Sequence, residues 1–446
     1  MSHYVERPRF SCALGGALET ITSLPDTVPI IHAASGCGGN LFGAQQAGGF
    51  YGSGYCGGLS MPSSNVSENE IIFGGDDRLK EQIQSTLEIL DGKLFVVVTG
   101  CMTEIIGDDP KAVANQFKSQ EKTIVVTNTG GFRGNSYKGY DLVLQTLFTD
   151  YVPKATIKID KLVNIWGIVP GHDPFFRGDL EEIKRLLKLL GIRGNTFFSY
   201  DETLENLFTS GEASLNIVFS RVYGIEAAES FQEKHGTSYV VEDIPVGPTA
   251  TEEFLYRIAG FFNIQKEVVD QAVAKEKKRY YRYIERVSDS YLDGDLQQYA
   301  IVISNANYYY SFTRFLADDL GWIPELTVIT DDLNDEQKKT LSASFKDFKN
   351  LKAPKLVFET DTSQIQARFT EGRQLYSYDR YLFAPSPLFV LGSSQDNDLA
   401  SELKAKSLSV SYPIVDRAVL DKGYAGFRGG LHLFEDLLDV LLRGEK

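Results

Sequence analysis

Short apolar runs rich in β-branched residues alternate with longer amphipathic stretches along most of this chain. In one such stretch, residues 178–190, Leu180, Ile183 and Leu187 recur at helical spacing on one face. Strands that alternate with helices are typical of parallel α/β layers, and ten strands predict several doubly wound sheets rather than one. The predicted strands are residues 94–99, 123–128, 162–169, 215–220, 238–241, 300–304, 326–330, 355–358, 387–392 and 408–411.

The length of 446 residues exceeds what one hydrophobic core usually serves. A fresh strand with a following glycine turn begins after residue 155. Charged helical stretches at 251–262 and 266–292 bridge the next two units. We therefore predict three α/β domains, at residues 1–155, 156–285 and 286–446.

The charge and the hydropathy pattern exclude several kinds of partner. The net charge is −15 and the pI is about 5.0, which repels phosphate backbones, and we identify no basic run interleaved with aromatic residues that offsets it. We expect no nucleic-acid partner. No segment approaches 18 uninterrupted apolar residues, so we expect no membrane span. The first residues lack the pattern of a secretory signal, and we expect a cytoplasmic protein.

All four cysteines, Cys12, Cys37, Cys56 and Cys101, lie in the first quarter of the chain. In a reducing cytoplasm they are metal ligands or small buried hydrophobes rather than disulfides. Cys37 lies in a glycine-rich turn after an apolar run, and Cys101 directly follows a strand, positions where α/β proteins place ligands. Thiolates there suit an iron–sulfur cluster. The glycine density of the first ninety residues predicts a wall around a cofactor more than a packed strand.

Other kinds of cysteine site fit less well. The wide gaps and the absence of a CxxC pair exclude small ferredoxin and zinc-ribbon patterns. A cysteine nucleophile with a histidine stays an alternative, although none of the five histidines shows a local catalytic signature.

Eight segments in order resemble the β-type subunit of the nitrogenase component-one family, and they span almost the whole chain. Four carry the cysteines or their surroundings: residues 10–17 (FSCALGGA), 29–37 (PIIHAASGC), 72–75 (IFGG) and 99–109 (TGCMTEIIGDD). Four more follow at 164–171, 243–254, 413–417 and 423–424. The resemblance implies three Rossmann-like domains, each a mostly parallel sheet flanked by helices.

The resemblance also implies a cluster and partners. Cys12, Cys37 and Cys101 would bind half of a P-cluster-type iron–sulfur cluster, and an α-type subunit would supply the other half and an iron-containing catalytic cofactor. The assembly would be an α2β2 heterotetramer. Phe73 would lie where an Fe protein docks with MgATP to deliver electrons, unless it is a core aromatic. Whether Cys56 is a further ligand stays open.

Departures from the family pattern refine the expected function. No cysteine follows Cys101, so the chain is expected to be the β-type partner rather than the chain that binds substrate. Gly131 stands where nitrogenase β-subunits present a serine that ligates the oxidised P-cluster. The leading hypothesis is a methylthio-alkane reductase, which cleaves carbon–sulfur bonds. The alternatives are a dinitrogen-reducing nitrogenase β subunit, a scaffold subunit for cofactor assembly, or a redox-inert α/β binding protein.

Overall fold

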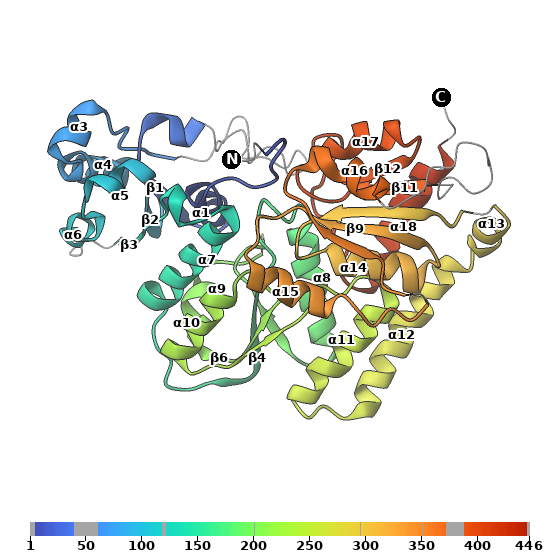
Figure 1. Ribbon diagram of the computed structural model, residues 1–446. Helices are drawn as coiled ribbons and strands as arrows, with labels where there is room; N and C mark the ends of the chain where they lie inside the picture. The colour runs from blue at the N-terminus through green and yellow to red at the C-terminus, as the bar shows by residue number, and fades with distance from the viewer. Residues whose placement is uncertain are drawn as a thin grey trace. The chain divides into compact units, whose positions relative to one another are not determined.

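The computed structural model describes residues 5–39, 61–117, 122–199, 201–294, 296–350, 352–371 and 388–443. Twelve named strands form three sheets, and every pairing between them is parallel. Helices accompany each sheet (Figure 1). The predicted α/β class is therefore confirmed. Cys56 and most of the glycine-rich sequence that follows Cys37 lie outside the described residues.

The chain divides into two compact units. The cysteine unit comprises Phe10–Arg177 and Ile192–Val241, and the C-terminal unit comprises Met1–Arg9, Gly178–Gly191 and Glu242–Lys446. The cysteine unit holds two of the sheets and the C-terminal unit holds the third. The domain boundaries near residues 155 and 285 stay predictions.

The first sheet of the cysteine unit has the order β1-β2-β3, with β1 at Thr27–His32, β2 at Leu94–Thr99 and β3 at Thr123–Thr127. Strand β2 is buried along its whole length because it is the central strand, which explains its unbroken apolar sequence. Phe95 and Ile30 pack with Leu79 and Ile83 of α4 in one core. The helices and short helical turns that accompany this sheet are α1 (Ala13–Thr22), α3 (Glu68–Phe73), α4 (Asp76–Ile89), α5 (Cys101–Ile106), α6 (Pro110–Asn115), η1 (Gly131–Arg133), α7 (Ser136–Thr146) and η2 (Leu147–Tyr151).

The second sheet of the cysteine unit has the order β5-β4-β6-β7. Three buried asparagines tie its neighbouring strands together: the Asn195 amide donates to Asn164 Oδ1 at 2.8 Å, and the Asn164 amide donates to Asn216 Oδ1 at 2.9 Å. Each amide thus satisfies the next one inside the sheet. The elements are β4 (Ile159–Trp166), β5 (Arg193–Asn195), α9 (Leu204–Phe208), η3 (Thr209–Glu212), β6 (Ala213–Val218), α10 (Ile225–His235) and β7 (Tyr239–Val241).

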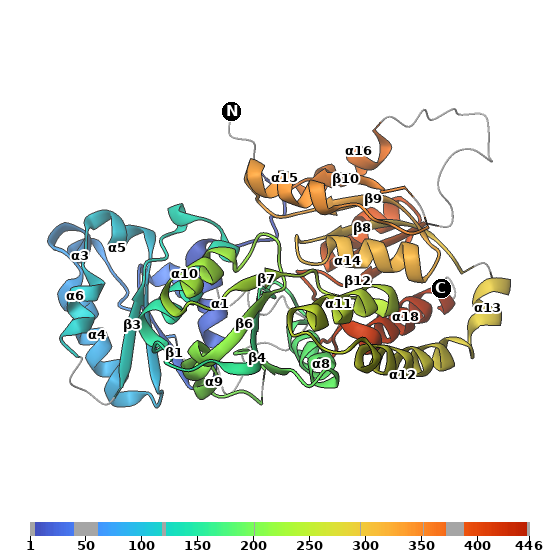
Figure 2. The same cartoon turned by 90° about the horizontal axis from the view of Figure 1, so that it is seen from below.

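The sheet of the C-terminal unit has the order β10-β9-β8-β11-β12 (Figure 2). Buried Asp179 near the start of α8 accepts the backbone N–H groups of Tyr424 and Ala425 at 2.6 and 2.7 Å, and the hydroxyl of Tyr308. It thereby joins segments far apart in the sequence. The elements are α8 (Phe176–Leu189), α11 (Gly247–Phe261), α12 (Lys266–Ile284), α13 (Ser288–Asp293), β8 (Tyr299–Ser304), α14 (Tyr309–Arg314), η4 (Phe315–Asp319), β9 (Ile323–Ile329), α15 (Asp335–Ser344), β10 (Lys355–Phe358), η5 (Thr362–Gln364), α16 (Ile365–Thr370), β11 (Leu388–Gly392), η6 (Ser394–Asp396), α17 (Asn397–Glu402), β12 (Lys406–Ser409) and α18 (Gly426–Leu442).

The structure differs from the sequence expectations in three elements. Strand β1 was not among the predicted strands. We assigned its segment to a cofactor wall because its apolar run is short and glycine-rich sequence follows it. Strand β5 has three residues and was missed for its brevity. The expected helix 266–292 is two helices, α12 and α13. Among the described residues, no helix is long and apolar enough to cross a membrane.

Buried Asp141 of α7 makes the stability of the cysteine unit pH-dependent. Its carboxylate accepts the backbone N–H groups of Gly224 and Ala227 at 3.0 and 3.3 Å. Burial nevertheless raises its pKa to about 7. The pKa of Asp141 in the folded state exceeds its unfolded value of about 4. The contribution of Asp141 to the free energy of unfolding is therefore present in acid and is lost as the pH rises through about 7.

We predict that Asp141→Asn, which keeps an acceptor and cannot ionise, removes this loss. The variant should become more stable than the wild type between pH 5 and 8, by up to about 4 kcal/mol at full ionisation. Denaturant midpoints measured across that range test it. Parallel pH profiles for the two proteins would contradict the assignment.

Candidate metal centre

Three cysteines lie at the ends of structural elements in the cysteine unit. Cys12 directly precedes α1, Cys37 follows β1, and Cys101 is the first residue of α5, directly after β2 and Gly100. Strands β1 and β2 pair in parallel with His32 opposite Thr99, so their carboxyl ends lie side by side. The parallel pairing therefore brings Cys101, at the start of α5, and Cys37, in the helical residues 35–39 after β1, to the same edge of the sheet.

Gly131 joins two of these cysteines. Its backbone N–H donates to Cys101 Sγ at 3.0 Å. A Cβ added at Gly131 would lie 3.2 Å from Cys101 Sγ and 3.3 Å from Cys12 Cβ. Position 131 thus lies against both cysteines.

Cys37 belongs to the same electrostatic environment. Burial raises the pKa of the Cys37 thiol, and the nearby Cys12 and Cys101 raise it further. All three cysteines are free; Cys12 and Cys101 are exposed, and Cys37 is half-buried. Three thiolates this close would repel one another, and a bound cationic group would relieve the repulsion.

The candidate donor set is three thiolates, and soft thiolates favour iron–sulfur chemistry. Within the described ranges, no group of three His, Cys, Asp or Glu side chains is arranged to hold one metal ion. The exposure of Cys12 and Cys101 leaves this face open to ligands from a second chain.

Glu104 holds the turn that contains Gly131. Its carboxylate accepts the Gly130 N–H at 2.7 Å, the Thr99 hydroxyl at 2.5 Å and Arg133 Nε at 2.6 Å. Its side chain is only 7% exposed. Glu104 lies within the motif at residues 99–109, but no role was assigned to this residue from the sequence. Its place three residues after Cys101 is the sequence signal that could have predicted a role near the cysteines.

A buried polar chain fixes the segment that carries Cys12. The Ser136 N–H donates to Ser11 O at 2.8 Å. The Ser136 hydroxyl lies 2.8 Å from His172 Nε2, and His172 Nδ1 lies 2.6 Å from Glu19 of α1. Ser136 and His172 are both almost fully buried. Ser136 is therefore engaged in anchoring residues 11 and 12, and the amide of Gly131 is the group that contacts a cysteine sulfur.

Close packing of α1 on α7 explains two glycines near Cys12. A Cβ on Gly16 would lie 1.8 Å from Ser136 O, and one on Gly139 would lie 2.0 Å from Ala13 O. Only glycine allows the backbones to approach this closely. Gly16 and Gly139 thus let α1, the helix that follows Cys12, pack closely on α7.

A second buried polar network lies beside the first. His32 Nδ1 is 3.0 Å from Ser64 Oγ, and His32 Nε2 is 2.9 Å from Asp108 Oδ2. Asp108 Oδ1 accepts the N–H of Gly75 at 2.8 Å. Burial lowers the pKa of His32, although Asp108 opposes this shift. The network ties the start of α4 to β1 and to the residues after α5.

Phe73 is the last residue of α3, just before Gly74 and Gly75, and 84% of it is exposed. The alternative that it is a core aromatic is therefore excluded. Ile72, Ile105 and Phe132 are also exposed, at 71%, 74% and 61%. Exposed apolar side chains on the elements that surround a site indicate a surface for protein contacts.

Neither His32 nor His172 supports a cysteine nucleophile. Both ring nitrogens of His32 are occupied by Ser64 and Asp108, and both of His172 lie against Ser136 and Glu19. Both imidazoles thus have structural roles. Cys56 lies outside the described residues, so its role as a further ligand stays a prediction.

Comparisons with known proteins identify the family of the chain. A family model described as nitrogenase component 1 type oxidoreductase matches residues 12–442. The nitrogenase molybdenum-iron protein beta chain of Bradyrhizobium diazoefficiens is 25% identical, over 97% of this chain and 83% of that protein. The nitrogenase iron-iron protein beta chain of Rhodobacter capsulatus is 23% identical, over 97% and 93%.

A solved structure described as nitrogenase Cp1 at pH 6.5 shares the fold, with a TM-score of 0.80 at 18% identity, over 99% of this chain and 94% of that one. The family match covers nearly the whole chain, and the similar full-length sequences are beta chains. The chain therefore belongs to the nitrogenase component 1 type oxidoreductases, as a β-type subunit.

Proposed function

We propose that this chain is the electron-relay subunit of a nitrogenase-like iron–sulfur reductase. Cys12, Cys37 and Cys101 would hold half of a P-cluster-type cluster, and an α-type subunit would hold the other half. The observation that carries the proposal is the convergence of Cys12 and Cys101 on Gly131, with Cys37 in the same electrostatic environment. The relatives named as beta chains support the same assignment.

The bound cluster would accept and release electrons at potentials that its protein surroundings tune. The chain's own residues have three tasks. The three thiolates would bind iron atoms of the cluster. The Gly131 N–H, which donates to Cys101 Sγ, stabilises negative charge on that sulfur and favours the reduced form. Glu104 fixes the position of this donor through its bond to the Gly130 N–H.

The exposed apolar residues suit the partners that such a relay needs. An α-type subunit would cover the exposed cysteines and exclude water, in an α2β2 heterotetramer. An Fe protein with MgATP would dock at the end of α3, where Phe73 and Ile72 are exposed. The His32–Asp108–Gly75 network holds the junction between the end of α3 and the start of α4 in place.

We propose that the reaction is the reductive cleavage of a carbon–sulfur bond, as in methylthio-alkane reductases. It would take place at a catalytic cofactor in the partner subunit. The support is Gly131, which offers no side-chain oxygen where nitrogenase β-subunits present serine. Dinitrogen reduction and a scaffold role in cofactor assembly are the alternatives. Anaerobic co-purification with the α-type subunit, followed by metal analysis and product assays with both substrates, distinguishes the three.

The first prediction concerns the ligands. Cys12→Ala, Cys37→Ala and Cys101→Ala should each strip iron and weaken pairing with the α-type subunit, because each removes a thiolate. Cys56→Ala is the matched control and should be milder. Iron per chain is measured after anaerobic purification, with circular dichroism to verify folding. Wild-type iron content in folded Cys101→Ala would refute the ligand assignment.

The second prediction concerns electron delivery. Phe73→Ala should slow turnover under electron-limiting conditions and leave the iron content unchanged, because it removes a contact of the docking surface. Ile89→Ala is the control, since Ile89 is 78% exposed at the other end of α4. Equal turnover in both variants would exclude the docking role.

The third prediction concerns redox behaviour. Gly131→Ser would place a hydroxyl beside Cys101 and Cys12, and an oxygen donor stabilises ferric iron. The midpoint potential of the oxidised couple should fall. Gly131→Ala adds the same Cβ without the oxygen, so it controls for the tight fit at 3.2 Å. Redox titration followed by electron paramagnetic resonance measures the effect, and identical potentials for the Ser and Ala variants would contradict it.

A further inference from the structure

Helix α12 has two faces of different character. Val269, Val273, Glu276 and Tyr280 are buried, and Glu276 pairs with Arg185 at 2.7 Å. The other face carries five cationic side chains over residues 275–286, which extend just past the end of the helix: Lys275, Lys278, Arg279, Arg282 and Arg286. This cationic row contradicts our expectation that the sequence holds no basic run interleaved with aromatic residues, since Tyr283 lies within it.

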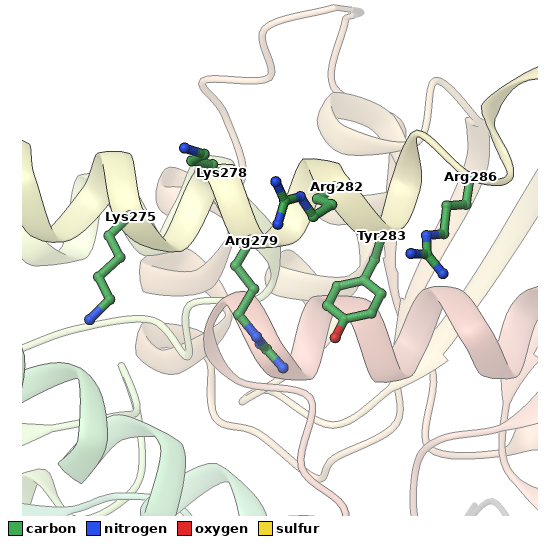
Figure 3. Close-up of a pocket in the computed structure, with 6 residues that line it drawn as sticks. All are labelled: Lys275, Lys278, Arg279, Arg282, Tyr283 and Arg286. Atoms are coloured by element: carbon green, nitrogen blue, oxygen red, sulfur yellow. The ribbon is translucent and has the colours of Figure 1, made fainter.

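Five cations and Tyr283 line one groove of about 440 Å³, and no carboxylate is among these residues (Figure 3). Lys275, Arg279, Tyr283 and Arg286 extend to one side of the helix, and Lys278 and Arg282 lie at its other edge. The Arg279 guanidinium lies 5.5 Å from the centre of the Tyr283 ring. The positive charges therefore gather around one hollow.

The cationic row is unfavourable for the isolated helix. Lys275 has cations three and four residues later, at Lys278 and Arg279, and Arg282 has Arg279 before it and Arg286 after it. Like charges at these spacings destabilise a helix. The chain carries 60 acidic residues against 45 basic ones, so carboxylates are plentiful. In this stretch, however, the lysine that pairs with a described carboxylate is Lys277, which lies outside the row and contacts Glu252. A bound anion would offset the repulsion.

We propose that this groove binds a compact oligophosphate, either inorganic or carried by a nucleotide. Arginine forks and lysine ammonium groups match phosphate oxygens, and a hollow of this size suits a small ligand. The exposed ring of Tyr283 offers a stacking surface for a base.

Two macromolecular occupants fit less well. The row extends over 12 residues, about 16 Å along the helix axis, and the chain's net charge of −15 repels a long polyanion beyond it. A protein interface has a largely apolar core, whereas the described residues that line this groove include a single aromatic and no aliphatic one. A small polyanion needs neither a long track nor an apolar core.

Calorimetric titration of the full chain with sodium tripolyphosphate tests the proposal. We expect one site with a Kd of about 10–100 µM, which weakens as salt is added. Arg279→Gln/Arg282→Gln should weaken binding by about tenfold or more. Lys338→Gln/Lys339→Gln removes the same charge from α15 and should leave the Kd unchanged. Circular dichroism verifies that each variant keeps its helices.

Further arms identify the source. If ATP binds more tightly than tripolyphosphate, and Tyr283→Leu removes this difference in Kd, the natural ligand is a nucleotide. If the two bind equally tightly, the ligand is an inorganic oligophosphate. The proposal is overturned if the double arginine variant binds tripolyphosphate as the wild type does. It is also overturned if orthophosphate, a hexaglutamate peptide or a short oligonucleotide binds as tightly as tripolyphosphate.

Discussion

The candidate metal centre depends on the parallel pairing of β1 with β2. This register places His32 opposite Thr99, and each strand then leads within a few residues to a cysteine. Two hydrogen bonds to the His32 carbonyl reinforce the arrangement, because the Gly100 N–H and the Thr103 hydroxyl both donate to His32 O at 2.8 Å. A slip of one residue would turn the side chains of β1 to the opposite face of the sheet. The strand register therefore determines whether Cys37 and Cys101 can serve one cluster.

Buried polar groups, rather than apolar packing alone, set the fine geometry. Glu104 satisfies three donors, and the Glu19–His172–Ser136 chain anchors the segment that carries Cys12. Breaking such a network leaves a buried donor or acceptor unpaired, which costs about 1–3 kcal/mol and more for a charged group. These networks resist small displacements of the thiols. A relay site benefits from that rigidity because less reorganisation accompanies each electron transfer.

Gly131 combines two properties at one position. Its amide donates to Cys101 Sγ, and its missing side chain leaves room beside Cys12. A serine at the same place would keep the amide and add an oxygen at the cost of a tight contact. A single residue can therefore change the ligand field of the proposed cluster without changing the fold. The fold is shared with the solved nitrogenase Cp1 structure, whereas the common thiolate ligands and the departure at position 131 are predictions from the sequence resemblance.

The sequence alone determined the α/β class and most of the strands, because apolar periodicity is a local property, whereas the thiol ligands stay a prediction from the family resemblance. Strand β1 was missed because the glycine-rich sequence around it hides its burial, and β5 was missed because three residues carry no period. Only the tertiary structure decided that Phe73 is exposed and that Ser136 is buried against His172. It alone also decided that Glu104 controls the turn at Gly131 and that the cations of α12 share one hollow. The physical reason is that burial, hydrogen-bond partners and charge convergence arise between residues far apart in the chain or on one face of a packed helix.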